Sequence, residues 1–125
     1  MNDSNEKKVT VSIVSHNHGG MILSLIKDLD RMGEVSRIIL TLNISEDIII
    51  HNCSKLHIIN NSKPKGFGDN HNAAFLLCKT EFFCVLNPDI TLLGNPFTKL
   101  LQQFISDDCC LVAPSVKNSN GKFED

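Results

Sequence analysis

The amino-acid sequence predicts an α/β protein with a mostly parallel β-sheet and helices on both of its faces. Runs of β-branched and other apolar residues alternate along the chain with segments in which apolar residues recur at helical spacing. The length of 125 residues and the hydrophobic content of 42% suit one domain with a core of ordinary size. Strands that alternate with helices favour parallel pairing, with the sheet covered on both faces.

The first half of the chain is predicted to contain three strands and one helix. Val9–Ser15 is a β-branched run that ends at the turn-like HNHGG, which is typical of a strand. Met21–Met32 carries apolar side chains at helical spacing, and Gly33 is suited to end that helix. Two further strands are predicted at Ser36–Leu42 and Lys55–Asn60, before a loop that contains Pro and Gly.

The alternation continues after that loop. A second helix is predicted at Asn70–Lys79, beginning near Asp69, whose carboxylate suits an N-cap or the first helical turn. A fourth strand is predicted at Glu81–Asn87. A third helix is predicted at Asn95–Ser106, with its first residue as the N-cap and the following proline in the first turn. Cys109–Pro114 is predicted to be a last strand.

The predicted domain organisation is a polar tail, residues 1–8, followed by one domain over residues 9–125. No internal repeat, low-complexity tract or linker interrupts this domain. The C-terminal SVKNSNGKFED has the composition of a connection to a further element. We therefore expect the domain to be truncated.

Composition and charge exclude several classes of protein. The chain has 12 basic and 14 acidic residues, a net charge of −2 and no cluster of Lys or Arg, so it lacks the electrostatic signature of a nucleic-acid-binding protein. Tyr and Trp, which commonly stack on single strands, are absent. No segment approaches the roughly 20 consecutive apolar residues of a membrane helix, and the polar N-terminus is not a secretory signal. We expect a soluble cytoplasmic protein.

Cysteines and histidines leave a transition-metal site open as an alternative function. The cysteines are odd in number and show no CxxC pairing, so they are expected to behave as small hydrophobic residues. Imidazole and thiolate nevertheless suit zinc or copper, although no spacing here matches a zinc-finger pattern. The ligands of such a site would come from His16, His18, His51, His57, His71 and Cys53.

Polar residues follow four of the predicted strands at the points where they end. The first strand ends in Ser15-His16-Asn17-His18, the second in Asn43, the third in Asn60-Asn61 and the fourth in Asn87-Pro88-Asp89. The carboxyl ends of parallel strands meet at one edge of a sheet, where ligands bind in open α/β folds. The sequence therefore predicts a single polar crevice at this edge.

Asn-Pro-Asp has the clearest chemical meaning among these strand ends. The usual P-loop, GxGxxG and GxSxG motifs are absent. The carboxylate of Asp89 suits Mg²⁺ or Mn²⁺ that bridges the phosphates of a nucleotide. Asn87 suits a hydrogen bond to a sugar hydroxyl, and Pro88 stiffens the backbone between them. All three residues also favour turns, so a purely structural turn is the alternative.

The order of these segments resembles the family 2 glycosyltransferases with the GT-A fold, particularly the rhamnosyltransferase-like members of bacterial polysaccharide assembly. The matching segments are VSIVSHNHGG, TLNISED, KPKGFGDNHNAA and LNPD, the last being a form of the family's Asp-x-Asp metal motif. The similarity extends from about Val9 to the end of the chain. It implies a Rossmann-like sheet and inverting transfer from a nucleotide-diphosphate sugar to a glycan or lipid-linked acceptor.

The resemblance also implies roles for individual residues. Asp89 would bind Mg²⁺ or Mn²⁺ on the nucleotide diphosphate, and Asn87 would contact ribose or phosphate. Further contacts with the nucleotide sugar are implied for Ser15, His16, Asn17, Asn43, Lys65, Gly66 and Asn72. The family's acidic contact to the nucleobase at the end of the second strand is Leu42 here, which leaves the base open.

A second departure concerns catalysis. In the family, the catalytic base and the acceptor site follow the metal motif, and this chain ends at Asp125. We therefore expect the nucleotide-sugar-binding half, with no catalytic residue assigned, located in the cytoplasm or peripherally at the inner face of the membrane. The alternative is a non-catalytic nucleotide- or partner-binding module that self-associates through exposed sheet surface.

Overall fold

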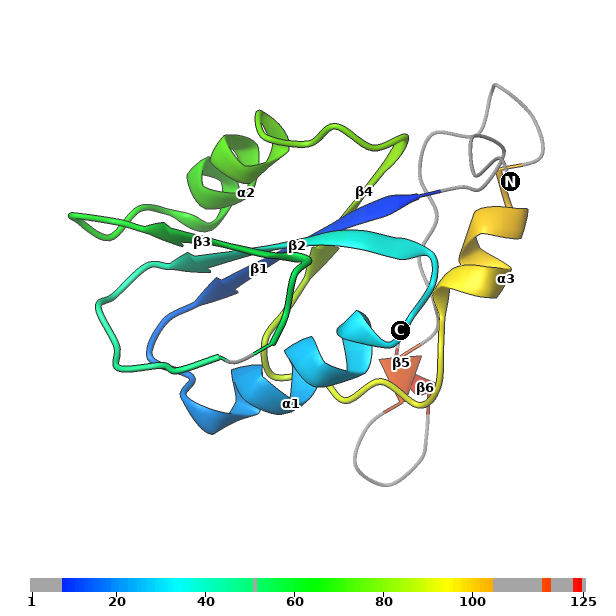
Figure 1. Ribbon diagram of the computed structural model, residues 1–125, viewed down its shortest axis with the longest axis horizontal. Coiled ribbons are helices and arrows are strands. Elements are labelled where there is room, and N and C mark those ends of the chain that lie inside the picture. The colour runs from blue at the N-terminus through cyan, green and yellow to red at the C-terminus, as the bar shows by residue number, and fades with distance from the viewer. Residues whose placement is uncertain (1–7, 51, 105–115, 118–122, 125) are drawn as a thin grey trace. The chain divides into compact units, whose positions relative to one another are not determined.

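Four parallel strands form the central sheet of the computed structural model, which describes residues 8–50, 52–104, 116–117 and 123–124. Each neighbouring pair of strands is parallel. The predicted α/β class with a mostly parallel, Rossmann-like sheet is therefore confirmed. In the spatial order β3-β2-β1-β4, the strands are β1 (Val9–Ser15), β2 (Val35–Leu42), β3 (Leu56–Asn60) and β4 (Phe82–Leu86) (Figure 1).

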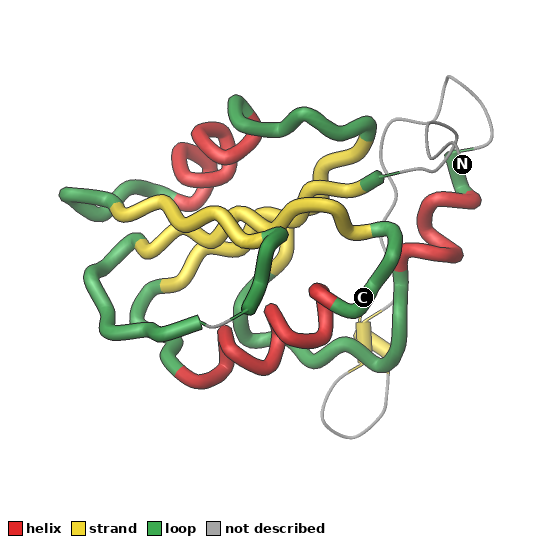
Figure 2. The backbone as a smooth tube through the Cα atoms, in the orientation of Figure 1, coloured by secondary structure: helices red, strands yellow, loops and turns green. Residues whose placement is uncertain are grey.

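Helices α1 (Gly20–Asp30) and α2 (Phe67–Phe75) lie on opposite faces of this sheet, as the backbone trace in Figure 2 also shows. Helix α1 contacts β2, whereas helix α2 contacts β1 and β2. Helix α1 presents an apolar stripe toward the sheet. The buried side chains of this stripe are Ile22, Leu25, Ile26 and Leu29. Helix α2 contacts β1 through polar side chains that are described below.

The core is centred on β1 and β2, which have a neighbouring strand on each side. The side chains of Val11, Ile13, Ile38 and Leu40 are fully buried. Side chains of the outer strands β3 and β4 are half-buried or exposed. This difference arises because the two inner strands are covered on both faces, so that even their polar residues Thr10, Ser12 and Thr41 are buried.

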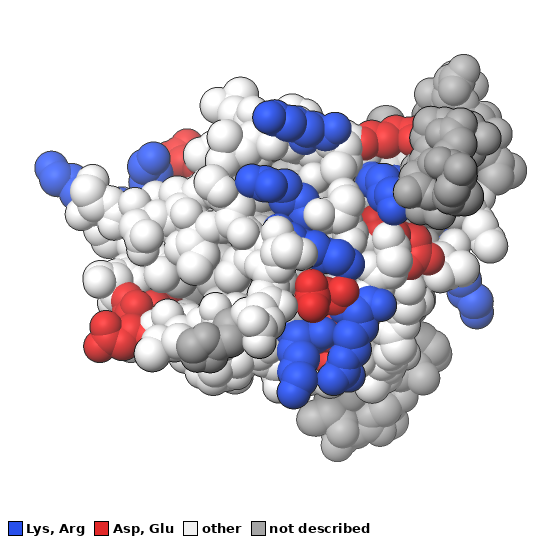
Figure 3. Space-filling model, viewed as in Figure 1, with Lys and Arg blue, Asp and Glu red and all other residues white. Residues whose placement is uncertain are grey.

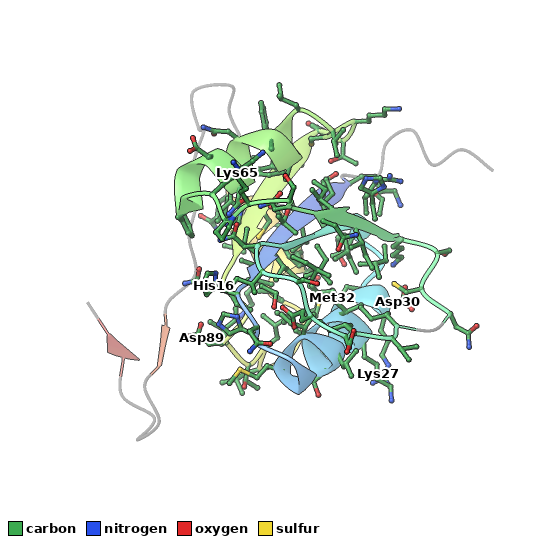
Figure 4. All side chains as sticks on the ribbon, turned by 90° about the vertical axis from the view of Figure 1, so that its left-hand side faces the viewer. His16, Lys27, Asp30, Met32, Lys65 and Asp89 are labelled. Atoms are coloured by element: carbon green, nitrogen blue, oxygen red, sulfur yellow. The ribbon has the colours of Figure 1, made fainter. Side chains whose placement is uncertain are left out.

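Lys55 connects the end of α1 to the start of β3. Its ammonium donates to the backbone oxygens of Asp30, at 2.8 Å, and Met32, at 3.1 Å. These carbonyls lie at the negative end of the helix dipole and have no partner within the helix. The lysine therefore caps α1, near the labelled Asp30 and Met32 of Figure 4.

The chain divides into two compact units, Met1–Leu92 and Leu93–Asp125. The first contains the parallel sheet with α1 and α2. The second contains α3 (Phe97–Gln102) and an antiparallel pair of short strands, β5 (Val116–Lys117) and β6 (Phe123–Glu124). The predicted division into a tail over 1–8 and one domain over 9–125 stays a prediction.

The second helix differs from its predicted bounds at both ends. It begins at Phe67, because Gly66 has extended backbone angles of φ −71° and ψ 167° and occupies the N-cap position. Asp69 lies in the first turn, as predicted. The helix ends at Phe75 instead of Lys79, since the amides of Leu77 and Cys78 bond to carbonyls three residues earlier, which tightens the turn that follows.

The third helix begins at Phe97, with Pro96 in the N-cap position, so the predicted cap at Asn95 is wrong by one residue. The Asn95 side chain still satisfies a helix-end donor, because its Oδ1 accepts the N–H of Phe97 at 2.9 Å. The end predicted at Ser106 and the strand predicted at Cys109–Pro114 lie outside the described residues.

On the face shown in Figure 3, acidic and basic side chains of the described residues occur together, and the basic ones among them form no continuous surface. This mixture agrees with the small net charge of −2. Within the described ranges, no helix combines the length and apolar character that a membrane span requires.

Candidate functional site

The carboxyl ends of the four parallel strands meet at one edge of the sheet. Ser15 pairs with Leu42 and Leu42 with Asn60 in the strand register, while Leu86 pairs with Ile13. Figure 4 looks toward this edge, and in that view His16 lies between Lys65 and Asp89. These three residues follow β1, β3 and β4 respectively, so the topology gathers predicted site residues that are far apart in the sequence.

The turn after β1 is held by the carboxylate of Glu46, for which the sequence predicted no role. Glu46 accepts hydrogen bonds from the Ser15 hydroxyl at 2.6 Å, the Asn17 N–H at 3.0 Å and the Gly19 N–H at 3.1 Å. Asn17 and Gly19 have φ angles of 64° and 58°, so both lie in the left-handed region. Ser15 is fully buried, whereas His16 and Asn17 are exposed at this edge of the sheet.

Asn43, directly after β2, uses its whole side-chain amide inside the protein. Its Oδ1 accepts the N–H of Lys65 at 2.8 Å and the Nδ2 hydrogen of Asn61 at 2.9 Å. Its Nδ2 donates to the backbone oxygen of Lys65 at 3.0 Å and lies 3.3 Å from the Nδ1 of His16. An amide has two donors and two acceptor positions, so this group is saturated by contacts to neighbouring strand ends.

Two further asparagines complete this arrangement: Asn61, which was predicted at the end of the third strand, and Asn70, for which the sequence predicted no part in the site. Asn61 donates from Nδ2 to the Oδ1 of Asn70 at 2.7 Å, and Asn70 donates from Nδ2 to the backbone oxygen of Lys65 at 3.2 Å. Asn70 is only 1% exposed. The sequence carried one indication of this network, the number of asparagines between residues 60 and 72, because a buried side-chain amide requires hydrogen-bond partners.

The start of α2 has open space around its glycines. A Cβ atom added at Gly66 or Gly68 would meet no atom of the described structure within 4 Å. The glycines are therefore not required by packing against the described residues, and the space suits close approach of a ligand to the backbone. Lys65 and Asn72, the other predicted contacts on this segment, are exposed.

The end of β4 presents Asn87 and Asp89 as exposed side chains, with Pro88 half-buried between them. Among the described residues, no group of three or more His, Cys, Asp or Glu side chains is arranged to hold a metal ion by itself. A single exposed carboxylate fits Mg²⁺ or Mn²⁺ that is shared with a substrate's phosphates, because such ions keep water and phosphate ligands and need few protein carboxylates. Asp89 fits this requirement.

The sequence matches the family model described as Glycosyl transferase family 2 over residues 10–125. The chain belongs to glycosyl transferase family 2. No curated protein matches it. Membership of the family supports glycosyl transfer from a nucleotide-sugar donor to a glycan acceptor, and the resemblance predicted from the sequence is confirmed at this level.

The histidine and cysteine alternative gains no support in the described part of this family 2 chain. His16 and His18 share a local turn, in which the His18 Nδ1 accepts the His16 N–H at 2.9 Å. No metal cluster forms among the described residues, and His51 lies outside them. The described cysteines, Cys53, Cys78 and Cys84, are free thiols, and burial raises the pKa of Cys84 to about 11.

His71 connects α2 to the sheet of this family 2 domain. Its Nδ1 lies 2.8 Å from the Ser12 hydroxyl of β1, and its ring packs edge-on against Phe67 with centroids 4.5 Å apart. The side chain is only 6% exposed. Burial disfavours the charged imidazolium and lowers the pKa of His71 below its ordinary value of 6.5.

This burial predicts acid destabilisation of the family 2 domain. Below the ordinary pKa of 6.5 the unfolded chain binds a proton at His71, and the folded chain binds it only at a lower pH. Stability should therefore fall as pH falls through 6.5 toward the folded-state pKa. Urea unfolding at several pH values between about pH 7.5 and about pH 5.5 measures the slope of the free energy of unfolding against pH. The slope should be smaller in His71→Gln, and an unchanged slope contradicts the prediction; His57→Gln is the control.

Proposed function

We propose that the chain binds a nucleoside-diphosphate sugar together with Mg²⁺ or Mn²⁺. The observation that carries the proposal is the gathering of Lys65, His16 and Asp89 at one edge of the sheet in a member of glycosyl transferase family 2 (Figure 4). A cation and an exposed carboxylate at the same edge suit the phosphates of such a donor and its metal ion. Family membership supplies the class of donor.

The proposed pose assigns one part of the donor to each strand end. The diphosphate and its metal lie at Asp89, with Asn87 hydrogen-bonded to ribose or phosphate. The base lies over the β1 turn, along the exposed side chains of His16 and Asn17, while Ser15 shapes that turn from inside. The sugar and its phosphates lie along Lys65, Gly66 and Asn72, where Gly66 leaves open space.

The proposed reaction is inverting transfer of a hexosyl or rhamnosyl group to a glycan acceptor. An acceptor hydroxyl oxygen attacks the anomeric carbon, the bond from that carbon to the diphosphate oxygen breaks, and a general base takes the hydroxyl proton. Bound at Asp89, a divalent cation would neutralise negative charge on the diphosphate leaving group. No described residue is assigned as the base.

Metal dependence of nucleotide binding tests the proposal. Titration of UDP or dTDP into the chain by calorimetry should show binding in the presence of Mn²⁺. Removing the metal with EDTA should weaken binding at least about tenfold, because Asp89 would hold the phosphates only through such a cation. Equal heats with and without Mn²⁺ contradict the metal assignment, and no binding of either nucleotide with Mn²⁺ contradicts the proposed donor site.

A further inference from the structure

Lys65 is held by its main chain but not by its side chain. Its N–H donates to the Oδ1 of Asn43 at 2.8 Å, and its carbonyl oxygen accepts from the Nδ2 atoms of Asn43 at 3.0 Å and Asn70 at 3.2 Å. Its ammonium makes no hydrogen bond or ion pair with any residue that the structure describes. Lys65 therefore presents a positive charge that has no partner among the described residues, on a backbone that these hydrogen bonds hold in place.

The asparagines that hold this backbone form one connected network. Asn61 donates from its Nδ2 to both other side chains, at 2.9 Å to Asn43 and at 2.7 Å to Asn70. Asn43 and Asn70 are only 7% and 1% exposed. Hydrogen bonds that connect side chains into one network restrict the conformations of those side chains. This network joins the ends of β2 and β3 to α2.

We infer that Asn70 is a positioning residue that holds Lys65 so that its ammonium contacts the diphosphate of the donor. The inference rests on the proposed function. Ammonium groups bind phosphate oxygens through charge-assisted hydrogen bonds. Fixing the backbone beforehand reduces the conformational entropy that is lost when the ligand binds. Asn70 is only 1% exposed, so it is assigned no contact with the donor and acts only through Lys65.

A double-mutant cycle on UDP affinity in the presence of Mn²⁺ tests this coupling. Lys65→Ala should weaken binding about tenfold, and Asn70→Ala should weaken it by a similar factor. The double variant should bind no more weakly than Lys65→Ala, because the positioning has no effect once the ammonium is removed. If the two losses multiply, Asn70 acts independently of Lys65 and the inference is overturned.

Two further variants separate positioning from loss of helix stability. Ala74→Gly weakens α2 at a fully buried position without touching the network, and should retain the UDP affinity of the unchanged chain. Asn70→Asp keeps the acceptor for Asn61 but removes the donor to the Lys65 carbonyl, and should bind as weakly as Asn70→Ala. Equal losses in Ala74→Gly and Asn70→Ala, or unchanged binding by Asn70→Asp, overturn the inference.

Hydrogen exchange gives a readout that needs no ligand. The Lys65 amide should exchange at least about tenfold faster in Asn70→Ala than in the unchanged chain or in Ala74→Gly. The reason is that the substitution removes the hydrogen bond from Asn70 to the Lys65 carbonyl oxygen, which helps to hold this backbone. An unchanged rate overturns the positioning role. If the unchanged chain binds no nucleotide, the proposed function fails, while the exchange rate still decides whether Asn70 holds Lys65.

Discussion

Replacing Asp89 with alanine is expected to weaken Mn²⁺-dependent binding of UDP or dTDP at least about 100-fold, because the proposed metal would lose its protein carboxylate. Asp89 is exposed, so the substitution removes no packing from the core. The free energy of unfolding should therefore change by less than about 0.5 kcal/mol. Calorimetric titration with urea unfolding of the same samples measures both effects.

The matched control is Glu81→Ala. Glu81 is an exposed carboxylate directly before β4, whereas Asp89 follows the carboxyl end of the same strand. The two variants have the same change in net charge, so a general electrostatic effect on an anionic nucleotide would appear in both. Glu81→Ala should bind within about threefold of the unchanged chain. Equal binding by Asp89→Ala and Glu81→Ala would exclude Asp89 as the metal ligand.

Replacing Glu46 with alanine is expected to cost about 2–3 kcal/mol of stability, since hydrogen bonds to charged groups each contribute about 1.5–3 kcal/mol and this carboxylate is partly open to water. The change removes the acceptor for the Ser15 hydroxyl and for the amides of Asn17 and Gly19. Nucleotide affinity should fall as well, because His16 and Asn17 would no longer be held in place at the carboxyl edge of the sheet. Urea unfolding and calorimetry measure the two losses.

The neighbouring Asp47 provides the control for this second variant. It is exposed and makes no hydrogen bond or ion pair with a described residue, so Asp47→Ala should leave stability nearly unchanged. The stability of Glu46→Gln should lie between those of Glu46→Ala and Asp47→Ala, because the amide keeps one acceptor oxygen but directs its N–H groups toward backbone donors. If Glu46→Ala is as stable as Asp47→Ala, the carboxylate does not hold the turn in solution.

The positions of predicted site residues at strand ends follow from local patterns. A β-branched run followed by a polar turn identifies the end of β1, and an apolar run followed by Asn-Pro-Asp identifies the end of β4. Parallel pairing then brings such ends to one edge, whatever the exact order of the strands. The helix boundaries were less predictable, because Gly66 in extended conformation permits α2 to begin earlier than its apolar pattern suggests.

The sequence by itself determined the α/β class, the polar edge and the family, because these depend on periodicity and on short motifs that can be read within one segment. Only the tertiary structure decided what Glu46, Asn61 and Asn70 contact, and that the Asn43 amide is saturated. The reason is that each of these hydrogen bonds joins separate elements. Their distances depend on the strand order β3-β2-β1-β4 and on register, which no local pattern specifies.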